Sequence, residues 1–177
     1  VFYDKGHCDQ AIDMYQRSLE IKELLVDVQG IAQTLANLGR VYATKGEWNR
    51  AIETYERSLK SEERLGDVRG IAQTKLFLAS AYSCKSQWEQ ALKMYQQSLE
   101  TFERLGDKHG MAQALNNLGL LYWHKGKWDR AIEMYEQSLR GFDRIGDVQG
   151  TATVWSNLGL VYAGKNEWDR AIKYYQK

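Results

Sequence analysis

The chain has 177 residues, of which 44% are hydrophobic and 27% charged, a composition typical of a folded protein rather than a disordered one. Its 24 basic and 23 acidic side chains give a formal net charge of +1, so the charge balance favours neither nucleic acid nor an anionic membrane as a partner. No apolar run reaches the roughly 18 residues that a membrane-spanning helix needs. The two cysteines, Cys8 and Cys84, do not suggest a disulfide framework.

The first predicted elements are the end of a helix at residues 1–5 and a second helix over 9–25. The longer helix is predicted because apolar residues recur at the spacing of one helix face. That stripe is formed by Ala11, Tyr15 and Leu19. Because the sequence would then begin inside one pair of helices, we expect it to be part of a longer array.

From residue 27 onward the sequence repeats every 40 residues, and each repeat contains two predicted helices, called A and B in chain order. Helix A is predicted at 28–44, 68–84, 108–124 and 148–164. Helix B is predicted at 48–65, 88–105, 128–145 and 168–177. We therefore expect residues 1–177 to form a single array, with a partial repeat at 1–26, full repeats at 27–66, 67–106 and 107–146, and a truncated repeat at 147–177.

The aromatic and small residues of the repeat are predicted to form its core. Each of these B helices opens with a tryptophan, with an alanine three residues later and a tyrosine seven residues later, a stripe that would face helix A. The predicted core residues are Tyr42, Trp48, Ala51, Tyr55, Tyr82, Trp88, Ala91, Tyr95, Tyr122, Trp128, Ala131, Tyr135, Tyr162 and Trp168. Burying one large aromatic side chain contributes roughly 1.5–3 kcal/mol, so packing explains the periodicity.

The turns carry the signals that stop one helix and start the next. A glycine can take the left-handed conformation that ends a helix, and an aspartate after it can cap the following helix. Such pairs occur at Gly66-Asp67, Gly106-Asp107 and Gly146-Asp147. The first turn of this kind has Val26 in place of the glycine, so we expect it to be looser. His7 and Cys8 are expected to lie in a turn between helix A and helix B.

The third full repeat reads Leu115, Leu118-Gly119, Tyr122, Gly126, Trp128, Ala131, Tyr135 and Ser138. In this order of large, small and aromatic residues the chain resembles the tetratricopeptide repeat family over nearly its whole length. Its 40-residue period exceeds the usual period of about 34, which makes it similar to the longer repeats of kinesin light chain and the Pins/LGN polarity adaptors. The resemblance implies an all-α fold, a right-handed α-solenoid of antiparallel helix hairpins that serves as a binding scaffold.

The resemblance also implies that helix A of each repeat lines a concave groove that binds a peptide. The groove residues predicted on this basis are Asn37, Arg40, Phe77, Asn116, Asn117, Leu120, Trp123, His124 and Asn157. Three of them, Asn37, Asn117 and Asn157, stand immediately before a Leu-Gly pair. Asparagines at this position in the relatives pair with the backbone of an extended peptide. The alternative is that these side chains bond locally or stabilise the contact between repeats.

The centre of the predicted groove is apolar. Its apolar residues are Leu76, Phe77, Leu120 and Trp123. Trp123 is the leading anchor for a partner, because tryptophan often dominates binding energy; the alternative is that it packs against a neighbouring repeat. Arg40 and His124 are the only ionisable candidates, whereas chaperone-binding members of the family use several basic residues to clamp a carboxylate. A co-chaperone role is therefore not expected.

The sequence offers no set of residues for catalysis, a metal or a cofactor. Cys84 and His124 would lie about 10 Å apart at a typical helix spacing, too far to share a zinc ion, and no third ligand is evident. We therefore expect a scaffold for a protein or peptide partner rather than an enzyme. The alternatives are a structural spacer or homo-oligomer joined through open terminal hairpins, and a sensor array within a larger multidomain regulator. The sequence does not fix the compartment, although the free cysteines favour the cytoplasm.

Overall fold

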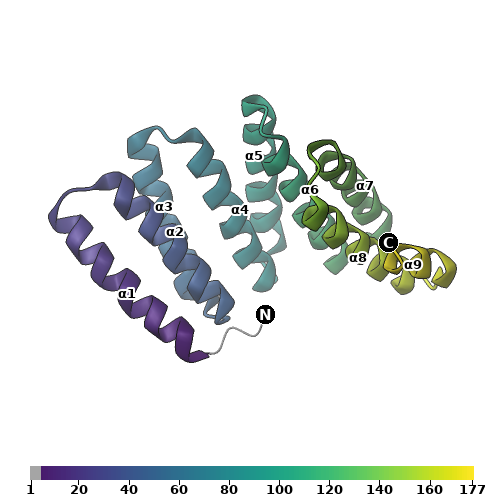
Figure 1. Ribbon diagram of the computed structural model, residues 1–177, viewed down its shortest axis with the longest axis horizontal. Helices are drawn as coiled ribbons and strands as arrows, with labels where there is room; N and C mark the ends of the chain where they lie inside the picture. The colour runs from purple at the N-terminus through teal and green to yellow at the C-terminus, as the bar shows by residue number, and fades with distance from the viewer. Residues whose placement is uncertain (1–4) are drawn as a thin grey trace. The chain divides into compact units, whose positions relative to one another are not determined.

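The computed structural model describes residues 5–177, in which all the regular elements are helices (Figure 1). They are α1 (Lys5–Leu24), α2 (Val28–Thr44), α3 (Trp48–Leu65), α4 (Val68–Cys84), α5 (Trp88–Leu105), α6 (Lys108–His124), α7 (Trp128–Ile145), α8 (Val148–Gly164) and α9 (Trp168–Tyr175). The predicted all-α class is confirmed, and the helices from α2 onward begin where the 40-residue repeat placed them.

The start of α1 differs from the prediction. The helix begins at Lys5, so His7 and Cys8 are helical instead of lying in a turn. In the equivalent turn after α2, Gly46 N and Glu47 N donate to carbonyls of α2 itself. The equivalent residues before α1, whose carbonyls would accept in such a turn, lie outside the described range. The helix end predicted at residues 1–5 also lies outside that range, apart from Lys5.

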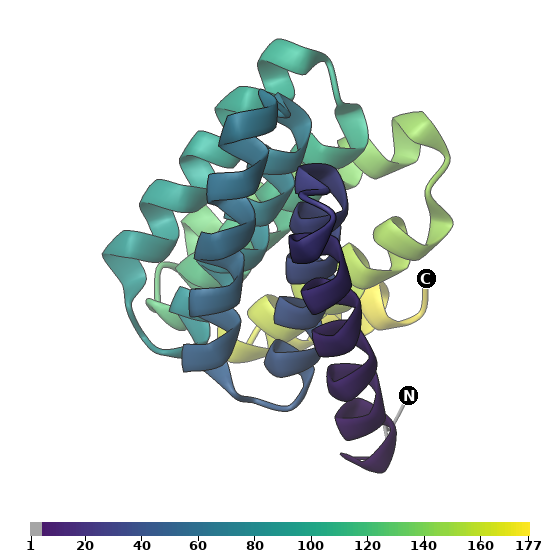
Figure 2. The ribbon, with the colours of Figure 1, turned by 90° about the vertical axis from the view of Figure 1, so that its left-hand side faces the viewer.

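The chain divides into two compact units, Val1–Ser98 and Leu99–Lys177, called unit 1 and unit 2, and their boundary falls within α5. In unit 1 each helix packs on the next, with α1 on α2, α2 on α3, and α3 on α4 (Figure 1). Figure 2 shows α1, in dark purple, lying alongside α2. In unit 2, α6 packs on α7, α7 on α8 and α8 on α9, and α6 also touches α8. The single array over 1–177 and its repeat boundaries stay a prediction.

The core of unit 1 lies between its hairpin helices. Predicted core residues Tyr42, Ala51 and Tyr55 are at most 3% exposed, and they cluster with apolar residues of α1 and α4. Trp48 and Tyr82 are half-buried against this cluster. Ala91 and Tyr95, in the part of α5 that belongs to unit 1, are also buried. The stripe read from the sequence therefore faces inward.

The core of unit 2 repeats this arrangement. Ala131, Tyr135 and Tyr162 are buried, and Tyr122 is half-buried against their cluster.

A buried serine of helix B reinforces the packing in the hairpins of both units, because its hydroxyl donates to a carbonyl of helix A at 2.7–2.9 Å. The pairs are Ser58 to Ala32, Ser98 to Ala72 and Ser138 to Ala112.

The tryptophans that open the B helices are not all core residues. Trp48 and Trp88 are half-buried, but Trp128 is 39% exposed and Trp168 is 59% exposed, so the core prediction is wrong for these two. Each tryptophan is the first residue of its helix and lies at the end of a hairpin. There Trp128 is surrounded by polar residues, among them Lys165. The periodic pattern predicts where each tryptophan lies in the repeat, but not how much of its ring is buried.

The turns between hairpins follow the predicted cap. Gly66 ends α3 in the left-handed region at φ 66°, and the Asp67 carboxylate accepts from Gly70 N at 2.9 Å at the start of α4. Aspartates accept in the same way at the starts of the other A helices, at Asp27, Asp107 and Asp147. Each cap satisfies a helix N–H that would otherwise lack a partner.

The turn at Val26 is as tight as the glycine turns, so the prediction that it is looser is wrong. Val26 N donates to Glu23 O at 3.1 Å and Asp27 N to Lys22 O at 2.9 Å, the same pattern that Gly66 N and Asp67 N make. The tight turn forces Val26 to φ 56°, a left-handed conformation that a β-branched side chain rarely adopts. The turn is therefore formed at the expense of backbone strain.

Replacing the strained valine tests this account. Val26 is 75% exposed, so Val26→Gly removes little packing. We expect the free energy of unfolding to rise by about 1 kcal/mol, because left-handed geometry costs a residue with a Cβ roughly 1–2 kcal/mol and glycine much less. Denaturant unfolding monitored by circular dichroism measures the change. The reciprocal control, Gly66→Val, should destabilise the chain by a similar amount, and equal stability of both variants and the parent would refute the strain.

A buried carboxyl group joins α3 and α4. Glu62 is 5% exposed, its Oε1 accepts from Thr74 Oγ1 at 2.8 Å, and Oε1 lies 3.1 Å from Ser58 Oγ. The Ser58 hydroxyl thus lies within donating distance of two acceptors, Ala32 O and Glu62 Oε1. Its Oε2 is buried without a partner in the described residues. Burial raises the pKa of Glu62 above the usual 4.5, although the two hydroxyls oppose this.

This raised pKa predicts how stability depends on pH. The folded chain holds the Glu62 proton at pH values where the unfolded chain has lost it, so this group's contribution is full below about pH 4.5 and falls as pH rises through the folded pKa. Glu62→Gln keeps both hydrogen bonds without a charge. We expect it to be more stable than the parent at pH 7, with the difference shrinking toward pH 4, in denaturant unfolding across that range. An exposed glutamate of the same helix, distant from Glu62, provides the control, since Glu53→Gln should show no such trend.

Candidate functional site

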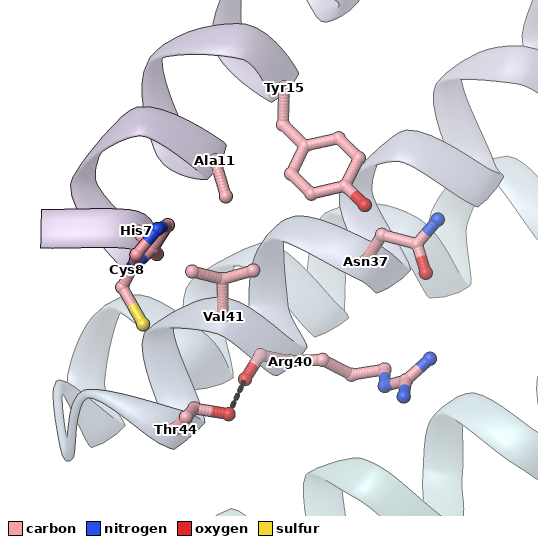
Figure 3. A pocket seen from close by; sticks show the side chains of 8 residues that line it. All are labelled: His7, Cys8, Ala11, Tyr15, Asn37, Arg40, Val41 and Thr44. Carbon is pink, nitrogen blue, oxygen red and sulfur yellow. Dashed lines mark hydrogen bonds between the residues drawn. The ribbon is translucent and has the colours of Figure 1, made fainter. Parts of the chain in front are cut away.

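The predicted groove residues lie in both units, and each unit's surface is described separately. In unit 1 a pocket of about 360 Å³ opens between α1 and α2 (Figure 3). Its lining residues are His7, Cys8, Ala11, Tyr15, Asn37, Arg40, Val41 and Thr44. Two of the predicted groove residues, Asn37 and Arg40, therefore line one pocket. The polar end of Asn37 and the ring of Tyr15 lie near one another in this view.

Phe77, the third candidate in unit 1, is more buried than a groove residue would be. It is half-buried against the core, and its ring stacks on Tyr55 with centroids 5.8 Å apart. The guanidinium carbon of Arg40 lies 5.8 Å from the centroid of the Phe77 ring, so Arg40 covers part of it. Leu76 was expected in the groove and is only 3% exposed, because it lies one turn beyond the buried Ala72 on the inward side of α4. The apolar centre predicted for this unit is thus mainly core.

In unit 2 the asparagines bond to one another across two A helices. Asn157 Nδ2 on α8 donates to Asn116 Oδ1 on α6 at 2.9 Å, and Asn116 Nδ2 lies 3.4 Å from Asn117 Oδ1. All three are half-buried. The geometry favours the alternative in which the asparagines stabilise the contact between repeats, and it joins Asn157 to Asn116 rather than to Asn117, the residue at its equivalent position.

Apolar side chains lie beside these asparagines. Leu120 on α6 is 36% exposed and its equivalent on α8, Leu160, is 48% exposed. Each lies one helical turn beyond an asparagine of the bonded set, so both point to the side that the amides occupy. Leu160 was not among the predicted groove residues, although its position 40 residues after Leu120 could have revealed it. We call Asn116, Asn157, Leu120 and Leu160 the α6–α8 face.

Trp123 lies one turn beyond Leu120 and is half-buried against the core of unit 2. Its ring centroid is 4.8 Å from that of the exposed His124. Packing within the unit therefore accounts for part of the Trp123 surface, and the rest borders the α6–α8 face. Trp155 on α8 is half-buried, and its Nε1 has no hydrogen-bond partner in residues 5–177.

Two ionisable groups of unit 1, Tyr95 on α5 and Cys84 on α4, have raised pKa values. Burial raises the pKa of Tyr95 to about 12, while its hydroxyl pairs with that of Ser80 at 2.9 Å, and burial also raises the pKa of the Cys84 thiol. Among residues 5–177, no three His, Cys, Asp or Glu side chains come together as a metal site would require. None of the helices in the same range is long and apolar enough to cross a membrane. These surfaces are suited to hydrogen bonding and apolar contact.

The antiparallel hairpins, their 40-residue period and the small residues at their contacts define a helical-repeat protein. A family model for the tetratricopeptide repeat matches residues 1–64, 70–144 and 110–177, which together cover nearly all of the chain. The chain belongs to the tetratricopeptide repeat family. The predicted resemblance is thereby confirmed. No curated protein matches the chain.

Solved structures with the same fold include proteins of several kinds. BtubC (BKLC) from P. vanneervenii is 27% identical, with a TM-score of 0.82 over 97% of this chain and 72% of that one. A putative kinesin light chain from Podosopora anserina with nearly identical TPR-like repeats is 15% identical, with a TM-score of 0.74 over 97% of this chain and 85% of that one. A Rap protein complexed with Competence and Sporulation Factor is 19% identical, with a TM-score of 0.87 over 97% of this chain but 48% of that one. The last two likenesses show the fold alone.

The asparagine pair makes a prediction about stability. Asn157→Ala removes the hydrogen bond to Asn116 and should lower the free energy of unfolding by about 1 kcal/mol. Asn37 occupies the equivalent position, and its amide makes no hydrogen bond within residues 5–177. The matched control Asn37→Ala carries the same change in helix propensity and should stay within about 0.5 kcal/mol of the parent. Equal losses in denaturant unfolding would show that the pair contributes nothing.

Proposed function

We propose that this chain is a protein–protein interaction scaffold that binds a peptide segment of a partner on the α6–α8 face. The observation that carries the proposal is the exposure of Leu120 and Leu160 beside the bonded amides of Asn116 and Asn157. Exposed leucines at equivalent positions of two adjacent helices form an apolar strip, and the amides supply donors and acceptors at its edge. Such a strip suits a segment with two hydrophobic anchors.

Membership of the tetratricopeptide repeat family supports a scaffold role, because the resemblance implied binding through the A helices. The Rap protein of similar fold was solved in complex with Competence and Sporulation Factor, so this fold can hold a partner. The neutral surface of the α6–α8 face supports the same conclusion, since its side chains are fitted to contact rather than to proton transfer. No observation on residues 5–177 favours a spacer, a homo-oligomer or a sensor over this role.

Trp123 is proposed as a secondary anchor. Its half-buried ring extends the strip by one turn beyond Leu120, while the buried part of the ring is held by the core of unit 2. Truncating it would therefore disturb folding as well as binding. The two exposed leucines allow a cleaner test, because replacing them changes the surface alone.

A displayed peptide library selected against the chain would identify ligands, whose affinity is then measured by calorimetry. We expect the double variant Leu120→Ser/Leu160→Ser to weaken the selected peptides at least about tenfold, since each leucine contributes roughly 1 kcal/mol or more of apolar contact. The control Ile145→Ser changes another exposed apolar residue of unit 2, 37% exposed, and should leave affinity unchanged. Unaltered affinity in the double variant, with an unaltered melting curve, would exclude this face as the binding site.

A further inference from the structure

Another pocket, of about 270 Å³, opens in unit 2 at the turn between α6 and α7. The residues around it are Gly126, Lys127, Trp128, Asp129 and Arg130, with Lys165 from the turn between α8 and α9. We call it the α6–α7 pocket. It is smaller than the roughly 300–1,000 Å³ of pockets that enclose a small molecule, so it suits a single side chain of a larger partner.

The aromatic wall of this pocket is Trp128, which is 39% exposed. The hairpin that follows it along the chain is in place, since α8 packs on α7 and Lys165, in the turn after α8, lines the same pocket. The exposed part of the ring is therefore surface that the neighbouring hairpin leaves uncovered. An exposed indole ring offers an apolar face on which another ring can stack.

The cations of the pocket come from a substitution within the repeat. In the α2–α3 and α8–α9 hairpins, the residue before the tryptophan is a glutamate that pairs with an arginine three residues later. Arg50 Nη1 donates to Glu47 Oε2 at 2.8 Å, and Arg170 Nη1 donates to Glu167 Oε2 at 2.7 Å. The α6–α7 hairpin has Lys127 in place of the glutamate, so the ion pair is replaced by two positive charges.

These two positive charges lack a counter-charge. Within residues 5–177, neither Lys127 nor Arg130 makes an ion pair, and both side chains are exposed. The acidic residue of the pocket, Asp129, is already neutralised, because its Oδ1 lies 2.6 Å from Lys165 Nζ. Like charges at neighbouring positions repel one another, so an anionic group that approaches both Lys127 and Arg130 would be favourable.

We propose that the α6–α7 pocket binds an acidic segment of a partner protein in which carboxylates flank an aromatic side chain. The aromatic side chain stacks on Trp128, Arg130 binds one carboxylate through its planar guanidinium, and Lys127 attracts another. Charge complementarity identifies the partner, because cations on both sides of an exposed ring match carboxylates on both sides of a ring. The pocket is formed by α7 and two turns, not by the A helices of the α6–α8 face, so the site goes beyond the proposed function.

The test uses the whole 177-residue chain and a synthetic peptide, acetyl-Glu-Glu-Phe-Glu-Glu-amide. We expect a saturable shift of the Trp128 indole N–H signal in an NMR titration. Replacing the phenylalanine of the peptide by alanine should weaken binding at least about fivefold, because the stacking ring is lost. The uncharged peptide acetyl-Gln-Gln-Phe-Gln-Gln-amide should bind at least about tenfold more weakly, because it cannot form the charge-assisted hydrogen bonds.

Lys127→Glu is the decisive variant of the chain, since it introduces the ion pair that Glu47 makes with Arg50. It should remain folded, as circular dichroism melting verifies, and should weaken binding of the acidic peptide at least about tenfold. The matched control Lys108→Glu makes the same charge change at the start of α6, where the lysine is also exposed. Its affinity should stay within about twofold of the parent.

Four outcomes overturn the proposal: no binding of the acidic peptide at its solubility limit, equal binding of the alanine peptide, equal binding of the glutamine peptide, or undiminished binding to folded Lys127→Glu. Displacement of the peptide by an equal concentration of inorganic phosphate also overturns it, since the pocket would then be a site for a small anion. The variant Leu120→Ser/Leu160→Ser should bind the acidic peptide as the parent does. A loss of binding there, with Lys127→Glu still competent, would place the peptide on the α6–α8 face instead.

Discussion

The hairpins depend on the contact between a glycine of helix A and a tyrosine ring of helix B. At Gly39, Gly119 and Gly159 the space for a Cβ is already taken by the ring of Tyr55, Tyr135 and Tyr175, respectively. The backbone of one helix thus lies directly against an aromatic ring of the other, which fixes the separation of the two helices. Packing density of this kind tolerates almost no added volume. The packing of the next helix in each unit depends on this contact, because the contact sets the positions of the two helix surfaces on which that helix packs.

Much of the fold could be predicted because the residues that end and cap the helices recur in several repeats. The glycine that ends α3 and the aspartate that caps α4 recur 40 and 80 residues later, so one ambiguous turn is corrected by its copies. What could not be predicted is the extent of burial. Trp128 stands in a sequence context similar to that of Trp48, before an Arg-Ala-Ile run, yet the residues around it in space are polar, and 39% of it stays exposed. The turn at Val26 could not be predicted either, because its hydrogen bonds hold it in a tight conformation that valine disfavours.

The candidate site was predicted in part. The A helices of unit 2 carry exposed leucines and half-buried amides, but equivalence in sequence did not identify which amides pair. Asn157 bonds to Asn116 because the crossing of α6 and α8 brings that residue, and not its equivalent Asn117, within reach. Leu76 and Phe77 are adjacent large apolar residues, and the sequence pattern does not separate them. In the structure Leu76 is buried beside Ala72, whereas Phe77 stacks on Tyr55 and is partly covered by Arg40. The direction of each side chain around a helix, rather than its type, separates core from surface here.

The serine-to-carbonyl bonds and the asparagine pair have a consequence for how the chain folds. These bonds join residues only 26 to 41 positions apart, and each A helix carries its own capping aspartate. Assembly governed by such short sequence separations requires little loop-closure entropy and is expected to be fast. It can also start at any hairpin and spread to its neighbours. An unfavourable substitution in one hairpin would then loosen that hairpin first, leaving its neighbours protected from hydrogen exchange.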